Sequence, residues 1–323
     1  MMPVYGSCLA PPSPDAPIPE QWKDSLPLAW DNGLIRFQRE NPDYSLATYK
    51  NFAFDQIMDG NGTINVCVRW GSNKTVTETN RQQIESQYRK IYQYWFEWLP
   101  GYDSFPFDKV DINFVGWAVA DRNLLQGSTD GLDIYTESKD EYGFLDCNPG
   151  CSVDKHLDGD FSDCPGGPEH RYHHFLWFDN IWGDRDMGAA IGYGIDISLW
   201  GWENVGSKMG DWPILVHEMG HTIGFLDSLD SGIANGTNSV CDIFFLPPNH
   251  PQEFVMKPGD GGAHVSTITE MEGWMIRYWW TRVSRLRGWQ SDNTIYPPLP
   301  DCPDEDSEIE KRSAISGARC ETA

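Results

Sequence analysis

One short motif constrains this chain more than any other feature: His-Glu-x-x-His-x-x-Gly-x-x-Asp, which runs from His217 to Asp227. Two histidines four residues apart lie on one face of a helix, so both imidazoles can reach a single metal ion. Glu218 projects about 100° away from His217, where it can hold a metal-bound water. Gly224 suits a helix end that needs a left-handed residue, and the following turn can bring Asp227 back as a third ligand. A fourth position open to water is typical of catalytic zinc.

Two features of this interpretation have alternatives. The helix could be an amphipathic core helix with two hydrogen-bonded histidines, and the third ligand could be another residue. The alternatives for that ligand are Asp230, Asp242, His250, His264 and Glu270. We expect Asp227, because Gly224 lies where the turn requires it. We also expect Pro213 in the first turn of this helix, with Asp211 as its cap.

The motif resembles the zinc signature of metzincin metallopeptidases, in the variant in which Asp replaces the third His, as in snapalysin-type peptidases. Metzincins carry a Met-turn beneath the metal, and the resemblance assigns that role to Met256 in the segment Phe254-Val-Met-Lys-Pro258. Astacin-like members have a Tyr two residues after this Met, where this chain has Pro258. Over residues 60–290 the chain is also similar to secreted bacterial and fungal metzincin-like proteins, some of which are joined to cellulose-binding modules.

The resemblance implies an α+β fold. It consists of a twisted mixed β-sheet with a long helix and an active-site helix, then an irregular C-terminal subdomain with a C-terminal helix and the Met-turn. We expect residues 59–290 to form this catalytic domain, with a disulfide-rich insertion at about 143–172. Residues 1–58 are expected to be a Pro-rich N-terminal arm packed on the domain, extended and without a helix over 3–27. Residues 291–323 are expected to be an acidic C-terminal tail.

Local patterns predict individual elements of this fold. A helix from Thr75 to Leu99 and another from Thr267 to about Trp289 each begin with a Thr-x-x-Glu capping box. Apolar alternation predicts strands. These are residues 64–70, 110–120, 132–136 and 174–178. By analogy with metzincins, the cleft's edge strand should lie near 174–178 and pair with an extended substrate.

Charge and cysteine content limit the environment and the partners. The net charge is −24, and such a surface repels nucleic acid and anionic membranes, so we expect neither as a partner. Eight cysteines without a Cys-x-x-Cys pair predict structural disulfides in an oxidising compartment, although Cys8 could instead cap the zinc. Glycosylation sequons at Asn61, Asn73 and Asn235 agree with secretion. The chain has no hydrophobic start and no long apolar run, so we expect a mature, secreted extracellular monomer.

The insertion at 143–172 contains clustered metal-binding residue types. Its acids have the oxygen ligands that calcium prefers, but they lack EF-hand spacing, so we expect a solvated, disulfide-pinned loop with Ca²⁺ as the alternative. These acids are Asp154, Asp158, Asp160 and Asp163. These acids are followed by His170, His173 and His174. We expect them to be surface histidines that precede a strand, and a second metal site is the alternative.

The motif and the resemblance together imply a secreted zinc-dependent endopeptidase. It would hydrolyse peptide bonds in a protein or peptide substrate through a zinc-bound water, with Glu218 as general base. A second class is a metzincin-scaffold protein that acts on or binds cell-wall polysaccharide, since aromatic residues make up 13% of the chain. A third is a scaffold without peptidase activity that serves protein interaction. The intact Glu218 argues against this last class.

Overall fold

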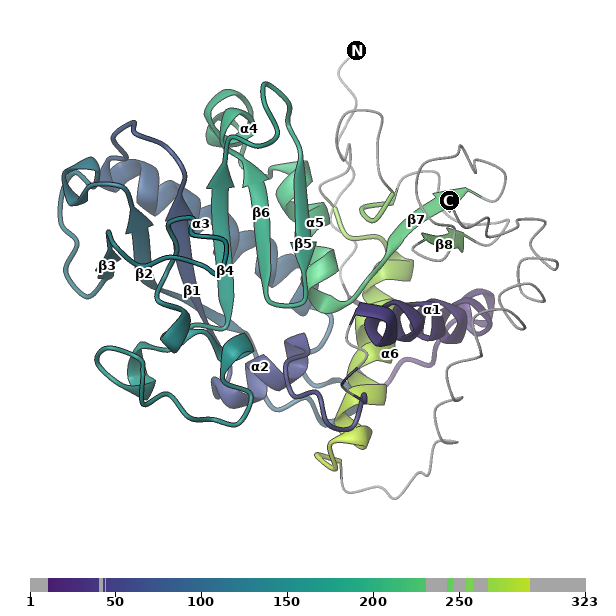
Figure 1. Cartoon of the computed structure of the whole chain (residues 1–323). Helices are drawn as coiled ribbons and strands as arrows, with labels where there is room; N and C mark the ends of the chain where they lie inside the picture. The colour runs from purple at the N-terminus through teal and green to yellow at the C-terminus, as the bar shows by residue number, and fades with distance from the viewer. Residues whose placement is uncertain are drawn as a thin grey trace, which may run out of the picture.

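The computed structural model describes residues 11–40, 43, 45–230, 243–246, 254–257 and 267–290. Its centre is a six-stranded sheet in the order β3-β2-β1-β4-β6-β5, which runs from left to right in Figure 1. The β5–β6 pair is antiparallel and the other four pairs are parallel. The strands are β1 Thr63–Trp70, β2 Asp111–Val119, β3 Asp133–Tyr135, β4 His174–Asp179, β5 Gly188–Ile191 and β6 Gly194–Ser198. This mixed α/β architecture is compatible with the expected α+β class.

Helices cover one face of the sheet and extend beyond its β5 edge. The long helix α3 lies behind the sheet in Figure 1, and α5 lies beside β5. The α-helices are α1 Ser25–Glu40, α2 Ala53–Asp59, α3 Glu78–Phe96, α4 Leu199–Asn204, α5 Pro213–Ile223 and α6 Glu270–Leu286. A separate two-stranded parallel sheet pairs β7 Asp227–Asp230 with β8 Ile243–Leu246. Short 3-10 helices lie at Glu20–Trp22, Tyr102–Ser104, Arg122–Leu124, Pro149–Cys151, Val153–Lys155, Pro168–His170 and Gly206–Lys208.

Both predicted capping boxes were wrong by two residues. The cap of α3 is Thr77, whose hydroxyl accepts from Asn80 N at 3.1 Å. Thr75 cannot cap the helix because the next residue, Val76, is held extended in a bridge with Leu125. Strand-like pairing with a distant segment therefore delays the start of the helix.

The cap of α6 is likewise Thr269, not Thr267, and the helix ends at Leu286 rather than near Trp289. Thr269 N and its hydroxyl both donate to Glu272 Oε2 at 2.9 Å, and this completes a capping box. Gly288, with φ of +68°, takes the chain out of the helix. Glu272 also accepts a hydrogen bond from Met256 N, which is distant in the sequence. This contact fixes Glu272 and therefore selects Thr269, the later threonine, as the cap.

The expectation that residues 3–27 contain no helix was also wrong in part. Helix α1 begins at Ser25 and includes Pro27 in its first turn, where the missing N–H has no helical partner. Trp30 of α1 packs edge to face on Trp279 of α6, with ring centroids 5.1 Å apart. This contact places α1 against α6 (Figure 1).

Aromatic residues at helical spacing in the sequence predict a buried stripe on each of the two long helices, and these stripes form much of the core. Those side chains are Tyr88, Ile91, Tyr92, Trp95 and Phe96 of α3, with Leu99, and Trp274, Ile276, Trp279 and Trp280 of α6. All of these are buried, whereas Tyr278, which belongs to the same predicted run of α6, is only partly buried. They give the protein a large core, on the face of the sheet that carries α5.

The strand at residues 174–179 is not the edge strand that the metzincin analogy predicted. This strand, β4, lies between β1 and β6, and β5 forms the edge next to α5. The glycines around 188–194 allow a tight β5–β6 hairpin, which adds two strands beyond β4.

Two disulfides secure the insertion and fit an extracellular protein. Cys67–Cys147 joins β1 to the insertion across 80 residues, and Cys151–Cys164 closes a loop of 13 residues within it. The other four cysteines, Cys8, Cys241, Cys302 and Cys320, lie outside the described residues. Sequon residues Asn61 and Asn73 are exposed, and Asn235 lies outside the described residues. No helix in the described ranges is long and apolar enough to cross a bilayer.

Candidate metal centre

Helix α5 carries the first part of the motif. Pro213 occupies the first helical position, as expected, because its fixed φ suits that position. Asp211 does not cap the helix: the cap residue is Trp212, without a side-chain bond. The Asp211 carboxylate instead accepts from Tyr94 at 2.9 Å and pairs with Lys90 at 2.7 Å, both on α3. These contacts tie the start of α5 to the long helix.

The end of α5 depends on Gly224. This residue has φ of +105°, the left-handed conformation that an L side chain adopts only with strain. Its N–H and that of Phe225 donate to carbonyls of the last helical turn, at 3.0 and 3.2 Å. The chain then reverses, and Asp227 comes to lie opposite the two histidines.

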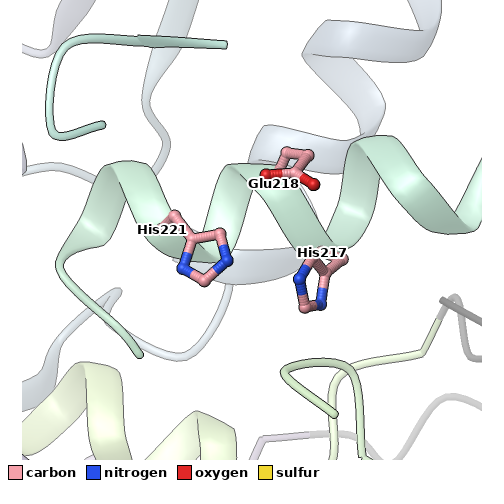
Figure 2. Close-up of side chains that lie close together, drawn as sticks. All are labelled: His217, Glu218 and His221. Atoms are coloured by element: carbon pink, nitrogen blue, oxygen red, sulfur yellow. The ribbon is translucent and has the colours of Figure 1, made fainter. Parts of the chain in front are cut away.

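Three ligand atoms converge at this point. Asp227 Oδ1 lies 3.1 Å from His217 Nε2 and 3.4 Å from His221 Nε2. Bonds of 2.0–2.1 Å at tetrahedral angles around a zinc ion would place ligand atoms about 3.3–3.4 Å apart. The imidazole rings are nearly perpendicular, at 88°, and Figure 2 shows both on one side of α5. The two separations from Asp227 are therefore close to those expected around a tetrahedral metal ion.

The hydrogen bonds of the two imidazoles set their tautomer. His217 Nδ1 lies 2.7 Å from Val255 O, and His221 Nδ1 lies 2.7 Å from Phe225 O. A carbonyl oxygen only accepts, so Nδ1 carries the hydrogen in both rings. In the neutral ring the Nε2 lone pair then faces the centre, which is the form that binds metals.

Two buried carboxylate oxygens at the centre lack hydrogen bonds. Among the described residues, Asp227 Oδ1 and Glu218 Oε2 are buried and accept none. With neutral imidazoles, Nε2 carries no hydrogen for Asp227 Oδ1; only a protonated His217, whose Nε2 lies 3.1 Å away, or a metal cation can compensate this oxygen. Unpaired buried oxygens are costly unless a cation compensates them. The residues present therefore fit a bound metal ion.

The electrostatics of the centre favour positive charge. Burial opposes protonation of His217, but Asp227 and Glu218 outweigh it and raise its pKa to about 9. Burial likewise acts to raise the pKa of Asp227, but the two imidazoles hold it well below its ordinary value. Burial raises the pKa of Glu218 despite the nearby histidines. Without a metal the centre thus attracts protons, which a metal cation would replace.

Glu218 differs in position from the other three residues. Ligand atoms of His217, Glu218 and His221 lie within 4.8 Å of one another, so these three could also hold a metal ion. The distances favour Asp227 as the third ligand, because its oxygen lies 3.1 and 3.4 Å from the two Nε2 atoms. Glu218 leaves α5 on another side (Figure 2). This position suits a proton acceptor beside the metal.

Strand β5 passes directly over Glu218. A Cβ added at Gly188 would lie 2.8 Å from Glu218 Cγ, so only glycine allows this approach. The sequence analysis did not single out Gly188, although it begins a glycine-rich run. The edge of the sheet therefore borders the metal centre.

Met256 packs beneath α5. A Cβ added at Gly220, between the two histidines, would overlap the Met256 sulfur. Met256 N donates to Glu272 Oε1 at 2.9 Å. Glu272 is fully buried, and burial raises its pKa to about 7. This carboxylate links α6 to the segment that holds His217, a role that sequence reasoning missed because it is a long-range contact.

The remaining candidates for the third ligand are not brought to the centre by any described contact. Asp242, His250 and His264 lie outside the described residues, as does Pro258 of the Met-turn segment. Asp230 lies at the end of β7, where its side chain is not described.

We expected His170, His173 and His174 to be surface histidines, but two of them are not. His173 and His174 are buried. His173 Nε2 lies 3.2 Å from Asp59 Oδ2, while His170 Nδ1 lies 2.6 Å from Asp133 Oδ2. These different partners separate the three rings. In the described part of the chain they form no second metal group.

The acids of the insertion mostly organise turns. Asp158 accepts from Asp160 N at 3.1 Å, and Asp160 accepts from Ser162 N at 3.0 Å. Asp154 is largely buried beside Lys155, and burial raises its pKa. Among the described residues these acids form no metal-ligand group.

Comparisons with protein-family models, curated proteins and solved structures give no match. The resemblance to metzincins therefore rests on the motif. The geometry of the centre carries the functional argument.

Proposed function

We propose that this protein is a secreted zinc metalloendopeptidase of metzincin type. The observation that carries the proposal is the convergence of His217, His221 and Asp227 on one point, beside the buried carboxylate of Glu218. Two imidazoles and one carboxylate suit zinc and leave a fourth position for water. Met256 packs beneath the helix, and this contact supports the Met-turn role that the resemblance implies for it.

The chain supplies the groups that peptide hydrolysis needs. When bound, zinc lowers the pKa of a coordinated water and polarises the carbonyl oxygen of the substrate. Glu218 accepts the water proton at its unpaired Oε2 and then donates it to the leaving amine nitrogen. Its raised pKa makes it a stronger base than an exposed glutamate. The Nδ1 bonds of the histidines keep both rings oriented toward the metal.

Strand β5 is the best candidate for binding the substrate backbone. Its pairing partner is β6 on one side, so the other edge is available within the described part of the chain. An extended peptide can add to such an edge by main-chain hydrogen bonds. Since Gly188 lies over Glu218, a peptide on this edge would place a backbone carbonyl near the metal centre.

The tryptophans favour the peptidase over a polysaccharide-directed role. Sugar-stacking surfaces require exposed aromatic faces, and none of the 15 tryptophans is exposed. Among the described residues the most exposed large aromatics are Tyr142 and Phe144, near the start of the insertion.

The experiment is casein hydrolysis by purified protein, with and without a chelator, together with metal analysis. We expect one zinc per chain, activity lost on chelation and activity restored by zinc. Iron in place of zinc would indicate oxygenase-type chemistry, since two histidines and one carboxylate also bind Fe(II). Glu218→Gln should retain zinc and lose activity by at least about a hundredfold, which matches general-base catalysis.

The matched control is Glu203→Gln on α4, whose carboxylate pairs with Lys74 near the surface. It should hydrolyse casein at the wild-type rate. Undiminished hydrolysis by Glu218→Gln would exclude Glu218 as the base. Bound zinc without hydrolysis of any protein substrate would exclude the endopeptidase proposal.

A further inference from the structure

A cavity of about 360 Å³ adjoins the metal centre. It lies between α1, the β5–β6 hairpin, the end of α5 and α6, which come from distant parts of the sequence. Its volume lies within the range of ligand pockets, about 300–1,000 Å³. His221 belongs both to the cavity wall and to the metal centre, so the cavity borders that centre.

The wall of the cavity is apolar and rich in aromatic rings. Trp30 and Phe37 of α1, Phe52, and Trp279 of α6 contribute rings. Among the described lining residues, His221 carries the one side chain that can be charged near neutral pH. A charged group inserted here would lose its water and find few polar partners, the buried Asn51 amide among them. A ring would gain edge-to-face contacts, so the wall selects a large apolar side chain, above all an aromatic one.

Helix α1 can form this wall because of a close backbone approach. A Cβ added at Gly33 would lie 3.3 Å from Gly224 O, in the turn between the metal ligands His221 and Asp227. The next residue, Leu34, lines the cavity. The N-terminal segment is therefore part of the pocket beside the metal centre.

The direction of β5 indicates which substrate residue reaches the cavity. The strand runs from Gly188, over Glu218, to Ala190 and Ile191 at the cavity wall. Antiparallel pairing is the more stable arrangement, so a bound peptide would run from Ile191 toward Gly188. With a rise of about 3.4 Å per residue, its residues just before the scissile bond lie nearest the cavity.

We propose that this cavity is a specificity pocket for a large apolar, preferably aromatic, side chain within about three residues on the N-terminal side of the scissile bond. The assignment of a scissile bond rests on the proposed peptidase function. The pocket itself rests on the apolar wall and on the position of His221 in that wall.

The test uses two equal substitutions on one helix. Leu34→Trp fills the cavity from α1, whereas Leu28→Trp places the same side chain at an exposed position of α1 outside the cavity. Cleavage sites in unfolded casein are identified by mass spectrometry. Values of kcat/KM are then compared for blocked peptides that carry Phe or Ala at the preferred position.

Wild type and Leu28→Trp should prefer Phe over Ala by about 10- to 200-fold, the range that apolar pockets reach. In Leu34→Trp this preference should fall to within about threefold, while Leu34→Ala, which enlarges the cavity, should retain it. An unchanged preference in Leu34→Trp would overturn the assignment. A preference confined to residues after the scissile bond would also overturn it.

Binding separates this inference from the peptidase proposal. The same Phe and Ala peptides are titrated calorimetrically into the Glu218→Gln protein. If wild type cleaves no peptide, but Phe binding exceeds Ala binding and Leu34→Trp removes the difference, the pocket stands and the peptidase fails. If wild type cleaves the peptides without preferring Phe over Ala, the peptidase proposal stands and the pocket assignment fails.

Discussion

His174 provides a quantitative test of the buried polar network beneath the β5–β6 hairpin. Gln56 Nε2 donates to Gly192 O at 3.0 Å, so the Gln56 Oε1 atom is left to accept from His174 Nε2 at 2.8 Å. His174 Nδ1 then accepts from Tyr88 at 2.8 Å. The ring is fully buried and neutral, and burial lowers its pKa to about 3.

This lowered pKa predicts a loss of stability in acid. The unfolded chain binds a proton at His174 near pH 6.5, while the native protein does not until about pH 3. The stabilisation is therefore present above pH 6.5 and is lost as the pH falls toward 3. The linkage relation gives a loss of about 2 kcal/mol in the free energy of unfolding between pH 7 and pH 5.

The assay is urea unfolding at pH 5, 6 and 7 for wild type and His174→Gln, both with a chelator so that metal release does not contribute. Burial raises the pKa values of Asp146 and Asp196 to about 6, and these groups act with the opposite sign. They are present in both proteins, so the difference between the two pH slopes isolates His174. Equal slopes would refute the argument, as would an ordinary pKa for His174 measured by NMR.

Three further predictions concern the metal centre and the covalent frame. Asp227→Ala should weaken zinc binding by more than about a hundredfold, beyond the loss typical of outer-shell residues; chelator competition measures this, and unchanged affinity would point to another third ligand. Gly224→Ala should lower the free energy of unfolding by about 1–3 kcal/mol because its φ is +105°, whereas Gly192→Ala, whose added Cβ meets nothing, should cost less in the same urea assay. Replacing the 80-residue disulfide by alanines should cost about 1.6 kcal/mol more than replacing the 13-residue one, by loop-closure entropy, and equal costs in guanidinium unfolding would contradict this.

Structural features that depend on only a few neighbouring residues could be predicted from the sequence. The spacing of His217 and His221 predicts a shared helix face, and Gly224 predicts the helix end, because both depend on backbone geometry within one or two turns. The aromatic stripe of α3 was predicted to be buried for the same reason. The choice between neighbouring threonine caps was not, since Val76 is held by a bridge to the distant Leu125.

Taken alone, the sequence determined the chemistry that is available: a helix with two imidazoles and a carboxylate, a glycine turn, a second carboxylate within reach and an apolar core. The second of these carboxylates, Asp227, is the third candidate ligand, and tertiary structure decided where the groups meet. It placed Asp227 opposite both histidines, made β5 rather than β4 the edge strand, and buried His174. It also brought Leu34 of α1 beside His221. The physical reason is that strand order and cavity walls depend on contacts between segments far apart in the chain, which no local periodicity encodes.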